Sequence, residues 1–256
     1  MLDLFYEAFA AIFHALLCGL VALVAASLSF SFGVRAVDHL PGEGRRPRCI
    51  YCSRPLKFIR FIPIFGWLLR KNFHLFPCVC GSKKMCWQQP FCEIAGFFLG
   101  VLAFCLQGWS IETIPLCIAL GVLPAMSVID FHFRIIPNSL NIIIGVCGLL
   151  FLLLVGEGMW LGIAVSAALL CVGLFLAVVY SSLRKREMLG LGDVKFFAAA
   201  GVWLDPFTAS LFLGLGGIIG LIFNLLWRRI SQDVQFPFGP ALCISFVICI
   251  IYRLTG

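Results

Sequence analysis

The sequence predicts an all-α polytopic membrane protein, and its composition and the length of its apolar runs carry that prediction. Of the 256 residues, 62% are hydrophobic and 12% are charged, whereas an average soluble domain is about 25% charged. The mean hydropathy is +1.06. Because lipid offers no hydrogen bonds, a membrane span must satisfy its own backbone groups, so apolar runs of about 20 residues predict helices.

Eight apolar runs are candidates for transmembrane helices. The first has no basic residue before it and is longer than the apolar part of a signal peptide, so we interpret it as a retained helix. The sixth is short, and it predicts a helix without predicting a full crossing. The eight runs cover about 8–33, 91–107, 112–129, 137–155, 159–182, 194–204, 207–227 and 238–254.

A long polar stretch separates the first run from the second, and its charge predicts the topology. Between positions 35 and 90 lie 11 of the 19 basic residues and two acids. Loops rich in Lys and Arg stay in the cytoplasm, so this stretch is predicted to be cytoplasmic and the N-terminus to be outside. No basic-aromatic motif accompanies the charge, so the expected surroundings are a lipid bilayer and no nucleic acid. The predicted parts are a first transmembrane helix, a cytoplasmic Cys-rich insert and a transmembrane helix bundle, at 1–34, 35–90 and 91–256.

Six of the 13 cysteines lie in or beside the insert. The insert is too short to bury a large core, and the cytoplasm disfavours disulfides, so metal ligation is the predicted role. Cys49 and Cys52 form a C-x-x-C pair. Cys78 and Cys80 form a C-x-C pair, and the two pairs could supply four thiolates to a structural zinc ion. Cys86 is the alternative fourth ligand, and unpaired thiols or redox chemistry are the other interpretations.

Two aspartates stand where apolar runs meet the predicted cytoplasmic face. Asp130 ends a run in SVIDFHFRIIPN, and Asp193 begins one in LGLGDVKFF. If they are close, both cannot be ionised at neutral pH, and the pair can activate water while its protonated member donates to a carbonyl. Gly190 and Gly192 would let the backbone bend and approach closely. Lys195 would steady a carboxylate or a substrate carbonyl, or else reach the membrane interface. The alternative is that each aspartate only marks a helix end.

The stretch GLGGIIG, from Gly214 to Gly220, has the glycine content of a nucleotide-binding loop. It lies inside an apolar run, and no strand precedes it. We therefore predict that Gly216 and Gly220 serve helix packing through their small size.

The order of several motifs resembles the type IV prepilin peptidases, a family of GxGD intramembrane aspartic proteases. LGLGDVKFFAAAGVWL is similar to the GxGD segment, and DFHFRIIPN to the first catalytic stretch, an Asp with a Pro seven residues later. SFGVRAVDHLP resembles the family's entry to the cytoplasmic loop, CIYCSRPLKFIRFIPIFGWLL its C-x-x-C segment, PFCE its P-x-x-E motif with Glu93, and FPFGPAL its late P-F-G-P motif. The resemblance covers nearly the whole chain.

The departures from the family pattern lie in or at the edge of the insert. They are Val34 for an Asn, His39 for an Arg, Arg60-Phe61 for an acid before I-P, a longer RKNFHLFPC stretch, and Gly81 for the second Cys of the later pair. They bear on the zinc ligands and on methyl transfer. Neither Asp130 nor Asp193 is affected by any of them.

The resemblance implies an endopeptidase with Asp130 and Asp193 as its catalytic pair, supported by Gly190, Gly192 and Lys195, with no metal at the pair. The implied substrates are prepilin or pseudopilin precursors, cut between a basic leader and an apolar helix at the cytoplasmic face of the bacterial inner membrane. Many family members then methylate the new N-terminus with S-adenosylmethionine, which is a second expectation.

Two other functions use the same residues. A thiol-disulfide membrane oxidoreductase would use the Cys pairs and would favour cysteines on the outside. A proton-coupled transporter would use the two acids and would favour positions near the bilayer midplane.

Overall fold

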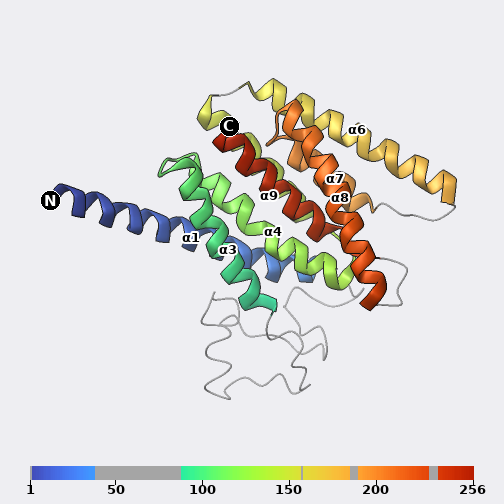
Figure 1. The fold of residues 1–256 in the computed structure, drawn as a ribbon, viewed down its shortest axis with the longest axis horizontal. Coiled ribbons are helices and arrows are strands. Elements are labelled where there is room, and N and C mark those ends of the chain that lie inside the picture. The colour runs from blue at the N-terminus through green and yellow to red at the C-terminus, as the bar shows by residue number, and fades with distance from the viewer. Residues whose placement is uncertain (1, 38–87, 157, 185–189, 231–235) are drawn as a thin grey trace, which may run out of the picture.

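The computed structural model describes residues 2–37, 88–156, 158–184, 190–230 and 236–256. Within these ranges the chain forms α-helices and no strand, which confirms the all-α prediction (Figure 1). Each predicted apolar run becomes one helix. The helices are α1 (Leu2–Val37), α3 (Gln88–Gln107), α4 (Thr113–Phe133), α5 (Asn138–Val155), α6 (Met159–Arg184), α7 (Leu191–Gly201), α8 (Pro206–Ile230) and α9 (Gly239–Thr255).

Six of the described helices, α1, α3, α4, α5, α6 and α8, are long and apolar enough to cross a membrane. The protein is therefore a multi-pass membrane protein. Helix α9 is slightly shorter, with 17 residues. Helix α7 has 11 residues, which corresponds to about 16 Å at 1.5 Å per residue, so it is too short to cross by itself. The sixth apolar run is thus a helix without being a full span.

Helix α4 forms the centre of the bundle. Of its membrane-span window, 72% is buried, against 22% for each of α1, α6 and α8. It packs against α1 and α3 on one side and against α5 and α9 on the other. In Figure 1, α1 and α6 lie at opposite ends of the molecule, with α4 between them. A residue near the end of α4 can therefore meet helices from both halves of the chain.

Small residues bring α1, α3 and α4 into close contact. A Cβ atom added at Gly100 of α3 would lie 2.4 Å from the backbone oxygen of Cys18. One added at Gly121 of α4 would lie 2.4 Å from that of Ala22. Because lipid tails are as apolar as the helices, such close backbone packing is a main source of association between membrane helices.

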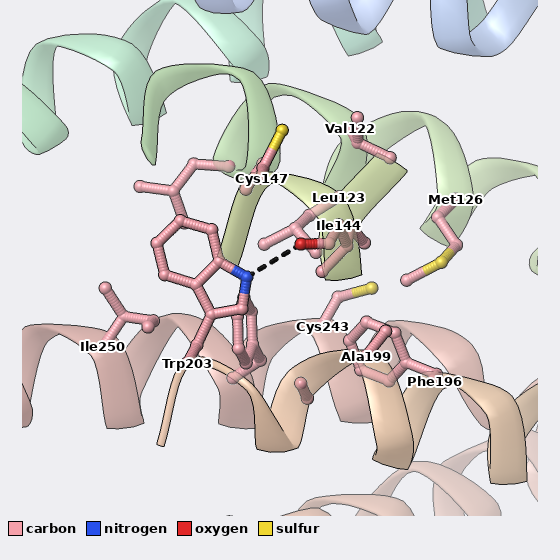
Figure 2. Close-up of a cluster of buried hydrophobic side chains, with 14 of the residues drawn as sticks. Val122, Leu123, Met126, Ile144, Cys147, Phe196, Ala199, Trp203, Cys243 and Ile250 are labelled. Atoms are coloured by element: carbon pink, nitrogen blue, oxygen red, sulfur yellow. Dashed lines mark hydrogen bonds between the residues drawn. The ribbon is translucent and has the colours of Figure 1, made fainter. Parts of the chain in front are cut away.

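An aromatic cluster fixes α7 inside the bundle. The chain after α7 buries Trp203, whose indole N–H donates to the backbone oxygen of Ile144 on α5 at 2.9 Å (Figure 2). Phe196 of α7 packs edge-to-face against Phe212 of α8 and Phe246 of α9. Edge-to-face contacts of this kind add to the area buried, so a helix too short to span is still held on several sides.

Gly216 and Gly220 of α8 serve helix packing, as predicted. A Cβ atom at Gly220 would lie 2.4 Å from the ring of Phe238, the residue just before α9. One at Gly216 would lie 3.2 Å from Leu242 of α9. Gly214 and Gly217 meet nothing within 4 Å. Gly220 therefore sets how closely the start of α9 approaches α8.

Candidate active site

Asp130 lies in the last turn of α4, and its side chain is buried. The helix ends after Phe133 because Arg134 takes a left-handed conformation, with φ 56°, and its N–H donates to the backbone oxygen of Asp130 at 2.8 Å. A left-handed residue just after a helix is a common way of ending it. Pro137 then begins the turn into α5. The local sequence thus places the carboxyl group one turn before a sharp helix end.

The start of α9 holds the carboxyl group of Asp130. The backbone N–H of Gly239 donates to Asp130 Oδ2 at 2.7 Å, in a buried environment. The first N–H groups of a helix have no partner within it, so they are ready donors to a negative oxygen. A Cβ atom at Gly239 would lie 2.8–2.9 Å from the carboxyl atoms. Only glycine leaves room for Asp130 in this position.

Asp193 lies in the first turn of α7 and is buried too. Gly190 precedes the helix in an extended conformation, and its backbone oxygen accepts from the Asp193 N–H at 3.0 Å. A Cβ atom at Gly190 would lie 3.3 Å from Asp193 Oδ2. The first glycine of the GLGD stretch therefore leaves space beside the carboxyl group, and the helix N-terminus favours negative charge there.

The second glycine of this stretch joins α7 to the turn that follows Asp130. A Cβ atom at Gly192 would lie 3.0 Å from Ile136 Cβ and 3.3 Å from its backbone nitrogen and oxygen. The side-chain amide of Asn141, on α5, donates to the Gly192 backbone oxygen at 3.2 Å. The backbone at Gly192 therefore approaches another segment closely, as expected, and that segment is the 135–137 turn.

The predicted supporting residue Lys195 is exposed, and its ammonium group donates to Asn138 Oδ1 at 2.8 Å. This bond also ties α7 to the start of α5. Its position on the exposed rim of the site allows contact with an incoming chain.

The two carboxyl groups come together although 63 residues separate them in the sequence. Gly192, the residue before Asp193, packs against Ile136 in the turn that follows Asp130, and the start of α9 binds Asp130 from another side. Two acids in an apolar enclosure titrate as one coupled pair. Such a pair can take a proton from water with one member and give a proton with the other.

Two buried polar atoms beside the pair have no hydrogen-bond partner among the described residues. They are Asn141 Oδ1 and Trp227 Nε1. Asn141 is bonded to Gly192, the residue before Asp193. The ring of Trp227 packs edge-to-face on Phe131, the residue after Asp130, with 5.4 Å between the ring centres. Neither Asn141 nor Trp227 belongs to a recognisable sequence motif. The one feature of the sequence that could have pointed to them is a polar group near the end of an apolar run.

No group of three or more His, Cys, Asp or Glu residues in the described ranges could hold a metal ion. The predicted zinc ligands Cys49, Cys52, Cys78 and Cys80, and the alternative Cys86, lie outside those ranges. Of the six cysteines in or beside the insert, only Cys92 is described, as a fully buried free thiol in α3.

The sequence profile of the Type IV leader peptidase family matches residues 117–225, a range that contains both aspartates. A prepilin leader peptidase/N-methyltransferase of Aeromonas salmonicida (strain A449) is 31% identical over 216 residues, covering 81% of this chain and 71% of that protein. The chain belongs to the type IV leader peptidase family.

Two more proteins similar to this chain are also prepilin leader peptidase/N-methyltransferases by name. The protein of Legionella pneumophila is 27% identical over 216 residues, covering 81% of this chain and 72% of that protein. The protein of Bacillus subtilis (strain 168) is 26% identical over 234 residues, covering 90% of this chain and 91% of that protein. No solved structure matches the chain.

Two further family motifs have a defined place in this member of the type IV leader peptidase family. The late P-F-G-P motif supplies Gly239, whose N–H binds Asp130. The P-x-x-E motif supplies Glu93, which is buried and accepts from Ser27 Oγ at 2.7 Å and from Gln89 Nε2 at 3.1 Å. The P-F-G-P motif thus contacts the aspartate pair. The P-x-x-E motif links α1 to α3 through the hydrogen bond between Ser27 and Glu93.

Proposed function

We propose that this protein is an endopeptidase that removes the basic leader from prepilin-like precursors, with Asp130 and Asp193 as its catalytic pair. The observation that supports the proposal most is the pairing itself. Two buried acids stand at helix ends that pack together through Gly192 and Ile136, and both lie within the residues that match the leader peptidase family. Both lie at helix ends, as cleavage beside a membrane helix requires. A transporter would favour acids near the middle of a span.

In the proposed reaction the pair acts directly on water. One carboxylate takes a proton from a water molecule, which attacks the scissile carbonyl carbon, while the protonated partner donates to the carbonyl oxygen. Gly239 already binds Oδ2 of Asp130. The other oxygen, Oδ1, is therefore the one left to bind the water. No acyl-enzyme forms, so the reaction needs no Ser or Cys nucleophile.

A cleavage assay tests the proposed reaction. The purified protein in lipid should cut at least one precursor from a panel of pilin-like and pseudopilin-like proteins between its basic leader and its apolar helix. N-terminal sequencing of the product locates the cut. If the protein processes no precursor of the panel, or cuts within the helix, the proposed function is wrong.

A second proposed reaction is methylation of the new N-terminus with S-adenosylmethionine as methyl donor. The support is that the relatives of A. salmonicida, L. pneumophila and B. subtilis are all named leader peptidase/N-methyltransferase. Adding S-adenosylmethionine to the cleavage assay should then add one methyl group to the product, measured by mass spectrometry. An unmodified product under conditions of full cleavage would restrict the protein to proteolysis.

We further propose the bacterial inner membrane as the location, with the N-terminus outside and the insert in the cytoplasm. The support is the basic charge at the ends of α6 and α8, which matches that of the insert. Arg253, the one basic residue on the opposite side, donates to the backbone oxygen of Trp203. An epitope inserted at Lys71 should be reached by antibody only in permeabilised cells, and one inserted at Gly158 in intact spheroplasts. The opposite pattern would invert the topology.

Zinc in the insert is proposed from the cysteine spacing alone. Cys49, Cys52 and Cys78 would be ligands, with Cys80 as the fourth and Cys86 as its alternative. Such a site would supply folding free energy to a segment with little core of its own. Elemental analysis of freshly purified protein should find about one zinc per chain, and Cys49→Ser should lower that content. Metal-free protein of full activity would rule out a structural zinc.

A further inference from the structure

An open groove with a volume of about 700 Å³ lies between α3, α4, α8 and α9. Its walls are apolar along most of their length. Phe91, Ala95 and Leu99 line it from α3 at four-residue spacing, which places them on one face of that helix. Ile244 and Ile248 line it in the same way from α9. The step of eight positions from Phe91 to Leu99 corresponds to about 12 Å of helix, enough for about two turns of a bound helix.

One end of the groove adjoins the aspartate pair. Phe131, the residue after Asp130, and Pro240, the residue after Gly239, both line it. The hydrogen bond between Asp130 and Gly239 therefore lies directly behind this end. Cys243, one turn along α9 from Gly239, lines the groove as well. The groove and the site share a wall.

The same end of the groove carries two polar side chains. Gln88 and His132 line it, and their side-chain nitrogens are 2.5 Å apart. The groove is thus apolar over nearly all of its surface, with Gln88 and His132 standing at the end beside Asp130.

We propose that this groove holds the first two turns of the apolar helix of the precursor and so places the scissile bond at Asp130 and Asp193. The inference rests on the proposed function. A chain cut directly before an apolar helix must lay the start of that helix against the surface beside the catalytic pair. A lipid acyl chain would match the apolar walls. The position of the groove beside the two carboxyl groups favours the helix of the precursor, and the crosslinking experiment below distinguishes the two occupants.

Ala95 offers a way to block the groove. It is half-buried and lines the groove, whereas its neighbour Ile94 is exposed and does not. Ala95→Trp would fill the groove, and Ile94→Trp is the matched control on the same turn of α3. Two substrates are compared: a model precursor with a basic leader and an apolar helix of about 20 residues, and a soluble peptide that spans the cleavage site and lacks the helix.

With the model precursor, we expect Ala95→Trp to raise KM by about tenfold or more while kcat stays within about twofold. With the soluble peptide, Ala95→Trp should match the wild type, and Ile94→Trp should match it with both. Equal KM values for Ala95→Trp and Ile94→Trp on the model precursor would overturn the groove proposal and leave the proposed function intact. Failure of the wild-type protein to cut either substrate would instead reject the proposed function and, with it, this inference.

Photocrosslinking identifies the occupant. A photoreactive amino acid at position 95 of the Asp130→Asn variant, mixed with the uncut model precursor in lipid vesicles, should crosslink to the helix of the precursor. The same amino acid at position 94 should not. Crosslinks from position 95 only to lipid, or only to a second copy of this chain, would overturn the proposal.

Discussion

The contact between α1, α3 and α4 and the site formed by α4, α7 and α9 both depend on glycine, but against different neighbours. In the first region, Cβ atoms at Gly100 and Gly121 would strike backbone oxygens of α1 at 2.4 Å. In the second, a Cβ atom at Gly239 would strike the carboxyl group of Asp130 at 2.8 Å. The difference teaches that one residue type serves helix association in the first of these regions and the placement of an acid in the second.

The comparison separates effects on stability from effects on chemistry. In the α1–α3–α4 contact, added atoms would push two helices apart, and the cost falls on the folded state. In the site, a Cβ atom at Gly239 would move the carboxyl group of Asp130 and would leave the helices where they are. Variants of the two regions should therefore fail in different assays, and the following predictions test that separation in order of decreasing effect.

The largest effect is expected from the acids themselves. Asp130→Asn and Asp193→Asn should each lower the rate of precursor cleavage by about 1,000-fold or more, because an amide cannot exchange the proton. Both variants should insert and unfold like the wild type. Asp205→Asn is the matched control, since Asn serves equally well at the start of a helix and Asp205 bonds only to the N-terminal turn of α8 among the contacts described for it. Rapid cleavage by either site variant would exclude the aspartic mechanism.

Gly239→Ala should come next. The methyl group would displace the Asp130 carboxyl group, and a misplacement of about 1 Å costs about 100-fold in rate. The melting temperature in detergent should change little, since the collision is with a side chain at the site. Gly217→Ala, which meets nothing within 4 Å on α8, is the control. If Gly239→Ala cleaves like Gly217→Ala, the space that glycine leaves beside Asp130 has no part in the reaction.

Gly121→Ala should show the reverse pattern. Its methyl group would meet the backbone of Ala22 at 2.4 Å, and overpacking of this kind costs about 1–3 kcal/mol of folding free energy. Thermal unfolding in detergent measures the loss, while kcat per folded molecule should stay near the wild-type value. A stable but inactive Gly121→Ala protein would show that the two regions are not separate.

The smallest effect is expected from Lys195→Ala. The ammonium group is exposed and bonds to Asn138, and a hydrogen bond of this kind contributes about 1 kcal/mol or less when solvent is near. Cleavage should fall by less than about tenfold. A larger loss in kcat with an unchanged melting temperature would indicate that Lys195 contacts the scissile carbonyl directly.

The helices could be predicted because apolar run length decides them in lipid. The acids could be located because Asp130 and Asp193 interrupt that pattern at helix ends. Their partners could not be found in the same way. Gly239 meets Asp130 across 109 residues, and helices that are apolar all round give no amphipathic signal for the face that packs. The P-F-G-P resemblance marks Gly239 without giving its role.

The boundaries of the insert show the same limit. Helix α1 includes Val37 and α3 includes Gln88, so both helices reach past the apolar runs predicted at about 8–33 and 91–107. Polar residues such as Arg35 and Gln88 mark where the apolar pattern ends. A helix can extend past the hydrocarbon because water and side chains satisfy its ends there. Sequence pattern therefore locates the lipid boundary better than the end of the helix.

The bond between Asp130 and Gly239 has a consequence for when the protein becomes active. Asp130 is on α4, whereas Gly239 begins α9, the last helix along the described chain. During synthesis the acid enters the membrane well before its backbone partner exists. An unfinished chain thus carries both aspartates without the contact that orients the first. Under the proposed function, full cleavage activity therefore requires insertion of the helix that supplies Gly239.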